Sequence, residues 1–315
     1  MMRSTLRTDR HQEDEIEVSI ILVNYNTRVL TEQCLASIFE QTKDLVYEVL
    51  VVDNNSTDGS QSAIHERFPT VILIENESNC GFGKANNIGI QQAKGKYVFF
   101  LNTDTRLLNN AIKLFYDFME APASIPLGCI GGILLDEKMN RTHSSGPFPN
   151  KWEPIKSQLI GYFSKKYVVT RLHKEISSYS HVQPYLEVDY VTGADLFVAK
   201  SIVEKCGGFD PTYFMYFEES DLQYTMHAHG YINAIINGPE IIHFQGSSDL
   251  SPHFSPAKRI MNDTSMFYYL RKHSRIIEYV LFRIGYFLVK LPLLIDRRVS
   301  FVGRLNYQRF LLTNK

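Results

Sequence analysis

Hydrophobic residues in the first hundred positions form short continuous runs that are separated by stretches with helical periodicity. After the first run, Leu30, Cys34, Leu35 and Ile38 recur at the three- and four-residue spacing of one helix face. Apolar runs of this length, bounded by polar turns, are typical of buried strands, and here they predict strands over residues 18–23, 47–52, 71–74 and 97–101. Strands that alternate with helices predict an α/β fold with a Rossmann-like, mainly parallel sheet and helices on both faces.

Each predicted strand is followed by a polar loop, and in a parallel sheet these loops meet at one edge. The carboxyl ends of the strands are the usual ligand-binding positions in such sheets. Any one of these loops is equally compatible with a simple turn that carries helix caps. Four such loops in succession favour a ligand site. The loop residues singled out are Asn24 and Asn26, then Asp53 and Asn55, then Asn79, Gly81, Phe82 and Asn86, and finally Asn102 and Asp104.

Two of these loops indicate a phosphate-bearing ligand. Asp104 offers a hard anionic oxygen and Asn102 a neutral one, which suits a divalent cation that also holds phosphate oxygens. Gly81 lets the backbone approach a ligand closely, just before a predicted helix whose N-terminus can face a phosphate. The sequence lacks GxGxxG after the first strand and lacks GxxxxGK[ST], which disfavours a dinucleotide dehydrogenase and a P-loop enzyme.

The composition is that of a globular protein. The 315 residues are 44% hydrophobic and 21% charged, enough to bury one large core or two smaller ones. The four cysteines lie far apart without metal-ligand spacing, which favours reduced thiols and predicts no zinc site. Residues 1–17 are charged and lack an apolar centre, so we expect a flexible lead-in there and no signal peptide.

Small residues and then an acidic cluster mark the second half of the chain. The small residues lie within a strand or strand pair predicted over residues 190–199, where they would let a second reactant approach. The acids follow an aromatic stretch, and a carboxylate within hydrogen-bond reach of a hydroxyl can take its proton. They also begin a helix predicted from about residue 219 to 229, where acids complement the helix dipole. The residues are Thr192, Gly193 and Ala194, then Glu218, Glu219 and Asp221.

The last segment, residues 256–315, is helical in its pattern and carries twelve Lys or Arg against three Asp or Glu. Basic residues interrupt its most apolar part, which disfavours a membrane-spanning helix, and Pro292 should divide the helix. A basic face beside an apolar face suits an anionic membrane surface. The alternative is packing against the rest of the protein or a partner chain. The basic residues recur every seven positions, at Arg283, Lys290, Arg297 and Arg304.

Together these motifs resemble the family 2 glycosyltransferases of the GT-A fold, and most of all their rhamnosyltransferase-like branch. The resemblance implies an inverting transferase that uses a nucleoside-diphosphate sugar and Mg²⁺ or Mn²⁺. It implies a glycan or lipid-linked acceptor in cell-surface polysaccharide synthesis, a peripheral position at the cytoplasmic membrane face, and no nucleic-acid partner. The matching segments are VSIILVNYN, EVLVVDNNSTDGS, NCGFGKANNIG, FLNTDT, VTGADLFVAK, GGFDPTYFMYFEESDLQYTMHAHGY and IIHFQGSS.

The resemblance also implies roles for individual residues. Asn102 to Asp104 take the place of the family's DXD motif, with Asp104 as the metal and diphosphate contact and His243 as a second metal ligand. Asp53 corresponds to the nucleoside-contacting acid. Glu219 corresponds to the general base, with Glu218 as the alternative. The remaining donor-side residues are Asn24, Asn26, Asn55, Asn79, Gly81, Phe82 and Asn86, and the acceptor-side residues are Thr192, Gly193, Ala194 and Asp221.

The predicted organisation is a catalytic domain over residues 18–250, followed by a basic helical tail over residues 251–315. Within the domain, residues 18–104 form the nucleotide-binding half and residues 105–250 the acceptor half, which includes an insertion near residues 136–184. Two other functions stay open. A nucleotidyltransferase that makes NDP-sugars should carry a Gly-rich, basic loop after the first strand, which VNYNTR is not. A non-catalytic scaffold would bind sugar nucleotides without turnover.

Overall fold

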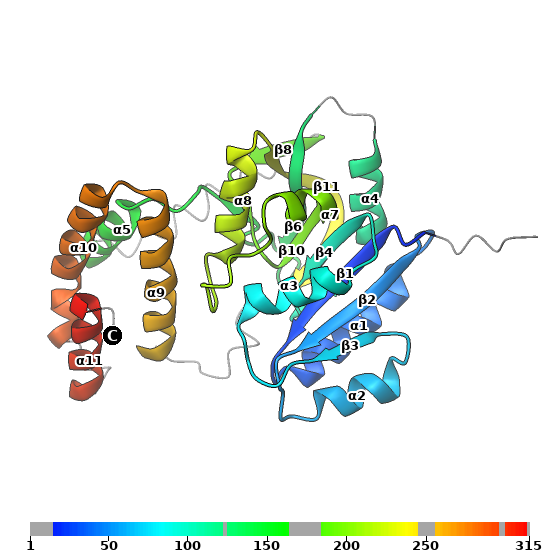
Figure 1. Ribbon diagram of the computed structural model, residues 1–315, viewed down its shortest axis with the longest axis horizontal. Helices are drawn as coiled ribbons and strands as arrows, with labels where there is room; N and C mark the ends of the chain where they lie inside the picture. The colour runs from blue at the N-terminus through cyan, green and yellow to red at the C-terminus, as the bar shows by residue number, and fades with distance from the viewer. Residues whose placement is uncertain (1–14, 122–124, 164–183, 245–255, 296–299, 314–315) are drawn as a thin grey trace, which may run out of the picture.

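A sheet of nine strands runs through the centre of the part of the protein that the structure describes (Figure 1). The structure is a computed structural model, and it describes residues 15–121, 125–163, 184–244, 256–295 and 300–313. The main strand order is β3-β2-β1-β4-β10-β6-β11-β5, and β8 also pairs with β11. The strands are β1 (Val18–Asn24), β2 (Tyr47–Asp53), β3 (Ile72–Glu75), β4 (Tyr97–Leu101), β5 (Thr105–Leu107), β6 (Leu127–Leu135), β8 (Tyr185–Val188), β10 (Asp195–Ala199) and β11 (Ile232–His243).

The first four strands occupy the positions predicted from the hydrophobic runs. β4 matches its prediction residue for residue, and β1, β2 and β3 each end one residue later than predicted. β1 lies between β2 and β4, and β3 pairs with β2, all in parallel. β10 is antiparallel to both β4 and β6, and β11 is parallel to β6, so six of the nine described strands share one direction. The predicted α/β fold with a mainly parallel sheet is confirmed.

Helices cover both faces of this sheet because successive strand residues point to opposite faces. On one face, Ile20 and Leu22 of β1 belong to a core that includes α1 and α4. On the other face, Ile21 belongs to a core that includes α3 and α8. These two layers hold the polar strand ends in fixed positions. The helices around the sheet are α1 (Arg28–Gln41), α2 (Ser60–Arg67), α3 (Phe82–Gln92), α4 (Ala111–Glu120), α7 (Lys200–Lys205) and α8 (Glu218–Ala228).

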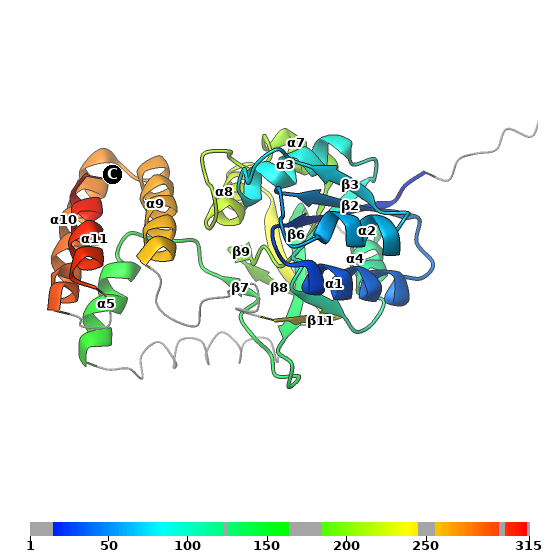
Figure 2. The ribbon, with the colours of Figure 1, turned by 90° about the horizontal axis from the view of Figure 1, so that it is seen from below.

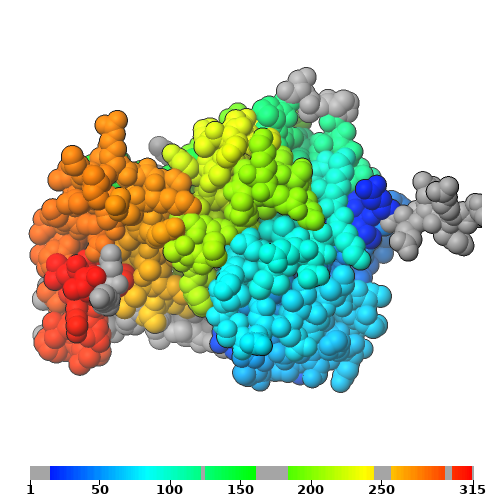
Figure 3. All heavy atoms as spheres, viewed as in Figure 1, coloured from blue at the N-terminus to red at the C-terminus, as the bar shows by residue number. Residues whose placement is uncertain are grey.

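A helical bundle lies beside the sheet at one end of the molecule (Figures 2 and 3). Its core contains Phe267, Phe282, Tyr286 and Phe310. Three helices and one short 3-10 helix come from the C-terminal segment, but α5 comes from the predicted insertion and places Ile155 against Gly285 of α10. As expected for Pro292, α10 ends just before it. The elements are α5 (Glu153–Phe163), α9 (Pro256–His273), α10 (Ile276–Lys290), η2 (Leu291–Ile295) and α11 (Phe301–Thr313).

The predicted basic face of the C-terminal segment is wrong, because the heptad-spaced cations that the structure describes turn inward. The Arg283 guanidinium lies 4.0 Å from the Phe267 ring centroid and donates to the Leu311 carbonyl. Lys290 is buried and its Nζ donates to Gln158 Oε1 at 2.7 Å. Arg304 donates to the Leu294 carbonyl at 2.6 Å. Apolar side chains instead occupy the exposed side of α10. The fourth cation, Arg297, and the predicted boundary at residue 250 lie outside the described residues.

Candidate functional site

A buried hydrogen-bond network joins the carboxyl ends of β1 and β2. Asp53 is fully buried, and its carboxylate accepts bonds from Asn24 Nδ2 at 2.5 Å, from the Ser56 amide and hydroxyl at 2.8 and 2.7 Å, and from Gln61 Nε2 at 2.8 Å. Asn26 extends the network, because its Oδ1 accepts from the Thr57 amide. Of these residues, Asn24, Asn26 and Asp53 were predicted to contact a nucleotide. In the structure their polar atoms bond to one another and shape the two loops.

The loop between β3 and α3 docks against the aromatic stretch before α8. Gly81 has a φ of 88°, and a Cβ at that position would lie 2.3 Å from the Phe214 carbonyl oxygen. The amide of Phe82 donates to the same oxygen at 2.8 Å. Only glycine combines this backbone conformation with so close an approach. This contact holds the N-terminus of α3 close to the polar residues at the ends of strands β1, β2 and β4.

A pocket of about 640 Å³ lies at this edge of the sheet. Its volume falls within the range of small-molecule sites. Asn54, rather than the predicted Asn55, lines it from the end of β2. Seven predicted residues line the pocket together, although they come from four parts of the chain: Asn79, Gly81, Phe82, Asn102, Asp104, Thr192 and His243.

Strand pairing brings Asp104 and His243 together inside this pocket. β11 pairs antiparallel with β5, and the amide of Phe244 donates to the Asp104 carbonyl at 2.9 Å. As a result His243 Nε2 lies 3.3 Å from Asp104 Oδ1. Nearby, Asn102 Oδ1 and His243 Nδ1 are buried and have no hydrogen-bond partner.

This donor set fits a divalent cation that shares its ligands with phosphate. A carboxylate and an unpartnered amide oxygen are suitable ligands for Mg²⁺ or Mn²⁺, and a neutral imidazole nitrogen is a common metal ligand in proteins. Within the described ranges, no group of three or more His, Cys, Asp or Glu side chains converges on one point. A cation held by these side chains would need further oxygen ligands, which phosphate groups can provide.

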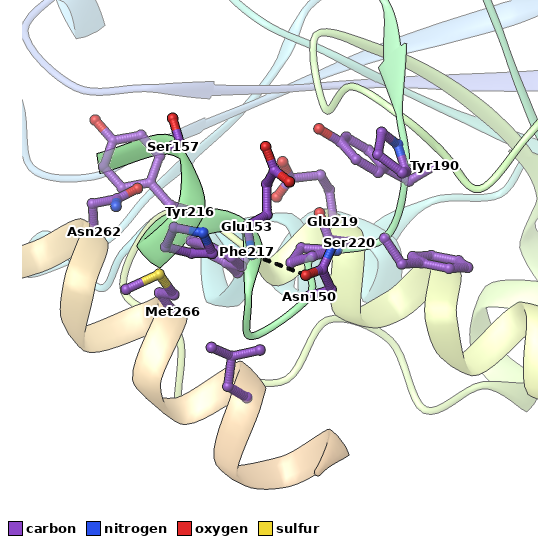
Figure 4. Close-up of a pocket in the computed structure, with 15 residues that line it drawn as sticks. Asn150, Glu153, Ser157, Tyr190, Tyr216, Phe217, Glu219, Ser220, Asn262 and Met266 are labelled. Atoms are coloured by element: carbon purple, nitrogen blue, oxygen red, sulfur yellow. Dashed lines mark hydrogen bonds between the residues drawn. The ribbon is translucent and has the colours of Figure 1, made fainter. Parts of the chain in front are cut away.

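A second pocket, of about 410 Å³, adjoins the first, and Tyr216 lines both (Figure 4). Glu219 lines the second pocket, whereas its neighbour Glu218 is 4% exposed and packs against Gly83 of α3. Tyr216 and Phe217 have φ values of 71° and 70°, which is unusual for large side chains. Strained backbone of this kind is concentrated at functional sites, and here it directly precedes α8, whose first turn places Glu219 at the pocket wall.

Gln223 fixes the position of Glu219, one helical turn further along α8. Its side-chain amide accepts from the Val191 amide at 2.7 Å and donates to the Val191 carbonyl at 2.8 Å, so α8 is tied to β9 (Tyr190–Val191), which pairs with β7 (Ser145–Gly146). The same Nε2 donates to the Glu219 carbonyl. Gly193 lies beside this helix start, since a Cβ on it would be 3.6 Å from the Glu219 Cβ.

The two adjacent glutamates have different surroundings. Burial raises the pKa of Glu219, and hydrogen bonds from the backbone amides of Glu219 and Ser220 partly oppose this shift. Burial, reinforced by the charge of Glu219, holds the pKa of Glu218 well above its usual value. Glu218 Oε2 also has no hydrogen-bond partner. The geometry therefore favours Glu219, which reaches a pocket, as the proton acceptor of the pair.

Several predicted residues lie next to the pockets without lining them. Ala194 is buried and its carbonyl accepts from the Asn102 amide. The side-chain amide of Asn86 donates to the Phe82 carbonyl within α3. Asp221, predicted on the acceptor side, instead ties α8 to the bundle: its carboxylate contacts Lys272 Nζ at 2.8 Å and His273 Nε2 at 2.6 Å.

The residues of the larger pocket that the sequence analysis did not single out include Asn54, His143 and Lys258. Asn54 directly follows Asp53 in a loop that the sequence analysis had identified, so its position in that loop could have marked it as a pocket residue. His143 approaches the site through β7 and lies 3.4 Å from the Tyr190 hydroxyl. Lys258 arrives from α9. No local pattern distinguishes these last two from any other exposed His or Lys.

Comparison with known proteins shows which family the chain belongs to. The family model "Glycosyl transferase family 2" matches residues 19–181. An N-acetylglucosaminyl-diphospho-decaprenol L-rhamnosyltransferase of Mycobacterium tuberculosis is 27% identical over 241 residues, which cover 73% of this chain and 76% of that protein. A poly(ribitol-phosphate) beta-glucosyltransferase of Bacillus spizizenii is 33% identical over 124 residues, 38% of this chain and 20% of that protein.

The fold itself is shared with solved structures. The mannosyltransferase PcManGT from Pyrobaculum calidifontis, solved with GDP-Man and Mn²⁺, superposes with a TM-score of 0.55 at 16% identity. The match covers 95% of this chain and 76% of that one. This likeness confirms the predicted GT-A architecture, in which a sheet with helices on both faces presents its strand ends to a ligand.

Proposed function

The chain belongs to glycosyl transferase family 2 and is a glycosyltransferase, and we propose that it transfers a sugar with inversion from a nucleoside diphosphate to a glycan or lipid-linked acceptor. The observation that carries this proposal is the junction of two pockets at Tyr216. One pocket holds the Asp104 and His243 pair, and the other holds the Glu219 carboxylate. One reactant can therefore occupy each pocket, with a proton acceptor in the wall of the smaller one.

The residues would divide the chemistry between them. Asp104 and His243, with Asn102, would hold Mg²⁺ or Mn²⁺, whose charge offsets that of the leaving diphosphate. Lys258, which lines the same pocket, adds positive charge from α9. Glu219 accepts the proton of an acceptor hydroxyl as its oxygen bonds to the anomeric carbon. The bond between that carbon and the diphosphate oxygen breaks on the opposite face, which inverts the configuration.

Donor binding tests this proposal directly. We expect one nucleoside-diphosphate sugar from a panel that includes dTDP-rhamnose, UDP-glucose, UDP-N-acetylglucosamine and GDP-mannose to raise the melting temperature more with Mn²⁺ than without it. A ligand that binds only the folded state stabilises it by mass action. Melting curves of the full chain measure the shift, and release of the nucleoside diphosphate with an acceptor extract checks turnover. Release of pyrophosphate, or binding without any turnover, would contradict the proposal.

We also propose that the bundle rests on an anionic membrane through an apolar face rather than the expected basic one. Ile277, Leu281, Ile284 and Leu288 follow helical spacing along α10 and are each more than half exposed. On the neighbouring α11, Phe301 and Leu312 are also exposed. Figures 1 and 2 place both helices on the side of the bundle away from the sheet. None of the described helices combines the length and apolarity needed to cross a membrane.

Charge favours an anionic lipid surface as the partner of this face. The segment after residue 255 has twelve basic and three acidic residues. Although Arg283, Lys290 and Arg304 turn inward, Arg271, Arg275 and Arg309 are exposed. Asp263 is buried between the Tyr286 and Tyr307 hydroxyls, and Glu278 pairs with Lys151. A surface that combines apolar side chains with net positive charge binds at the interface of anionic membranes. A lipid-linked acceptor, as in the name of the mycobacterial relative, would be presented at such a surface.

Vesicle co-sedimentation measures this contact. We expect the protein to sediment with vesicles that contain phosphatidylglycerol and less with vesicles of phosphatidylcholine alone. The double change Leu281→Glu and Ile284→Glu should weaken binding about tenfold or more, because it removes two apolar side chains that the membrane would bury. Leu114→Glu, at a partly exposed position on α4, is the matched control. Equal sedimentation of the double variant and the control would contradict the proposed membrane face.

A further inference from the structure

One helix of the bundle, α9, lines both pockets. Lys258 and Met261, near its start, line the larger pocket, and Asn262, Met266 and Leu270 line the smaller one. These positions recur at three- and four-residue spacing, so they share one face of the helix. Figure 4 shows Asn262 and Met266 along one side of the pocket that Glu219 lines. The bundle therefore meets the catalytic domain along a single helix face, next to the reacting groups.

The entry segment of α8, residues 215–221, contains strained backbone that α9 holds in place. Tyr216 and Phe217 have φ values of 71° and 70°, and such a conformation persists in large residues only where surrounding contacts fix it. Ser265 of α9 supplies one contact: its buried side chain donates from Oγ to the Met215 carbonyl at 2.7 Å, directly before the two strained residues. The ring of Tyr269 supplies another, 5.8 Å from that of Phe217 between centroids.

The other end of the entry segment is held by charge, two turns further along α9. Lys272 Nζ contacts Asp221 Oδ2 at 2.8 Å and Asp210 Oδ2 at 2.7 Å. His273 Nε2 contacts Asp221 Oδ1 at 2.6 Å. Asp221 is buried, so these two side chains take the place of water around its carboxylate. Because Asp221 follows Glu219 by two residues in the first turn of α8, the same contacts fix the part of the helix that carries Glu219.

We propose that Ser265, Lys272 and His273 are positioning residues for sugar transfer, which hold the entry segment so that the Glu219 carboxylate stays at the wall of the smaller pocket; this inference rests on the proposed function. Among the described residues that line the two pockets, none of these three occurs. They act through Met215 and Asp221 rather than by touching a reactant. A general base must lie within hydrogen-bond reach of the hydroxyl, and a displacement of about 1 Å can lower a rate about 100-fold. The bundle is thus required for transfer as well as for membrane contact.

Steady-state kinetics of the full chain test this role. The substrates are the nucleoside-diphosphate sugar that gives the melting shift and the acceptor extract. We expect His273→Leu to lower kcat about tenfold or more, because α8 loses a contact and Glu219 moves. The KM for donor and the metal-dependent melting shift should not change, because His273 lies away from the Asp104 and His243 pair. His273→Gln, whose amide can donate where Nε2 does, should restore most of the rate, and His65→Leu, at an exposed position on α2, should be normal.

Hydrogen–deuterium exchange shows directly whether α9 holds the entry segment, without requiring turnover. Backbone amides exchange when their local structure opens. Ser265→Ala should speed exchange over residues 215–221 and lower kcat, while exchange over residues 97–107 stays the same. Thr264→Ala is the matched control, because it removes an exposed hydroxyl that is bonded to the Ile260 carbonyl within α9. It should change neither exchange nor kcat.

The outcomes separate this inference from the proposed function. Normal turnover of the unaltered protein with an unchanged kcat in both Ser265→Ala and His273→Leu overturns the inference alone. Exchange over the entry segment that is unchanged in both variants also overturns it, as does a loss of the donor melting shift that matches the loss of rate, since a general weakening of the structure would then explain both. Absence of the donor shift or of turnover in the unaltered protein counts against the proposed function, and the exchange measurement still decides whether α9 holds the entry segment.

Discussion

Replacing Glu219 with glutamine is expected to lower the rate of sugar transfer by about 10²–10⁴-fold, the usual contribution of a general base. Glutamine keeps the size of the side chain but cannot accept the hydroxyl proton. The pocket with Asp104 and His243 is unchanged, so the donor should still bind. Initial rates, together with the metal-dependent melting shift, measure the two effects separately.

The Glu219 prediction has two controls within the chain. Glu204→Gln alters an exposed glutamate on α7 and should leave the rate unchanged. Glu218→Gln should leave far more activity than Glu219→Gln, because the Glu218 side chain is buried against α3. Transfer at the normal rate by Glu219→Gln would refute the assignment. A larger loss in Glu218→Gln would move the role of the base to that residue.

The pH dependence of transfer follows from the same side chain. A general base acts in its ionised form, and burial raises the pKa of Glu219. The ionised fraction, and with it the rate, therefore falls as the pH is lowered through this raised pKa. The acid limb of the rate profile should lie at higher pH than that of a solvent-exposed glutamate. Glu219→Asp, which keeps the carboxylate on a shorter arm, should retain an acid limb, whereas Glu219→Gln should lose it.

Replacing Asp104 with asparagine is expected to lower transfer by about 10³-fold and to remove the metal-dependent part of donor binding. A divalent cation contributes several kcal/mol to stabilising charge on a leaving group, and about 1.4 kcal/mol corresponds to a tenfold change in rate. The change removes the anionic member of the pair with His243, which lies 3.3 Å away. An asparagine fits the same space, so the fold should be maintained.

Mn²⁺ binding gives a readout of the Asp104 change that does not depend on activity. The signal of free Mn²⁺ in electron paramagnetic resonance reports how much ion is bound in the presence of UDP or GDP. Asp104→Asn should bind much less, and Asp117→Asn, at an exposed aspartate on α4, should bind as much as the unaltered chain. Metal-dependent binding that survives in Asp104→Asn would place the cation elsewhere.

Residues adjacent in sequence determined the fold class and the location of the site edge. Strands β1 to β4 were predicted to within one residue because each is a short apolar run whose burial does not depend on distant partners. The polar residues after them identified the edge for the same reason. Asn102, Asp104 and the loop around Gly81 all line the larger pocket, as their positions at strand and helix ends suggested.

Tertiary structure decided which polar groups face the pocket and which hold it together. From its position in the sequence, Asp53 was expected to bind a nucleotide. In the structure, however, its carboxylate accepts hydrogen bonds from four donors of three residues. Asp221 belonged to the acidic cluster in sequence, but α9 supplies its partners from about fifty residues further along the chain. Such contacts depend on how helices pack, and hydrophobic periodicity does not encode the identity of a distant neighbour.

The C-terminal segment shows most clearly which features the sequence determines and which depend on tertiary structure. The sequence by itself determined that this segment is helical, is divided at Pro292 and carries excess positive charge. It did not determine which side faces outward, because Arg283 and Lys290 find partners in α11 and α5 that local spacing cannot reveal. Because those cations turn inward, the apolar stripe of α10 is exposed. The tertiary structure alone also shows that α9 lines the pocket that contains Glu219.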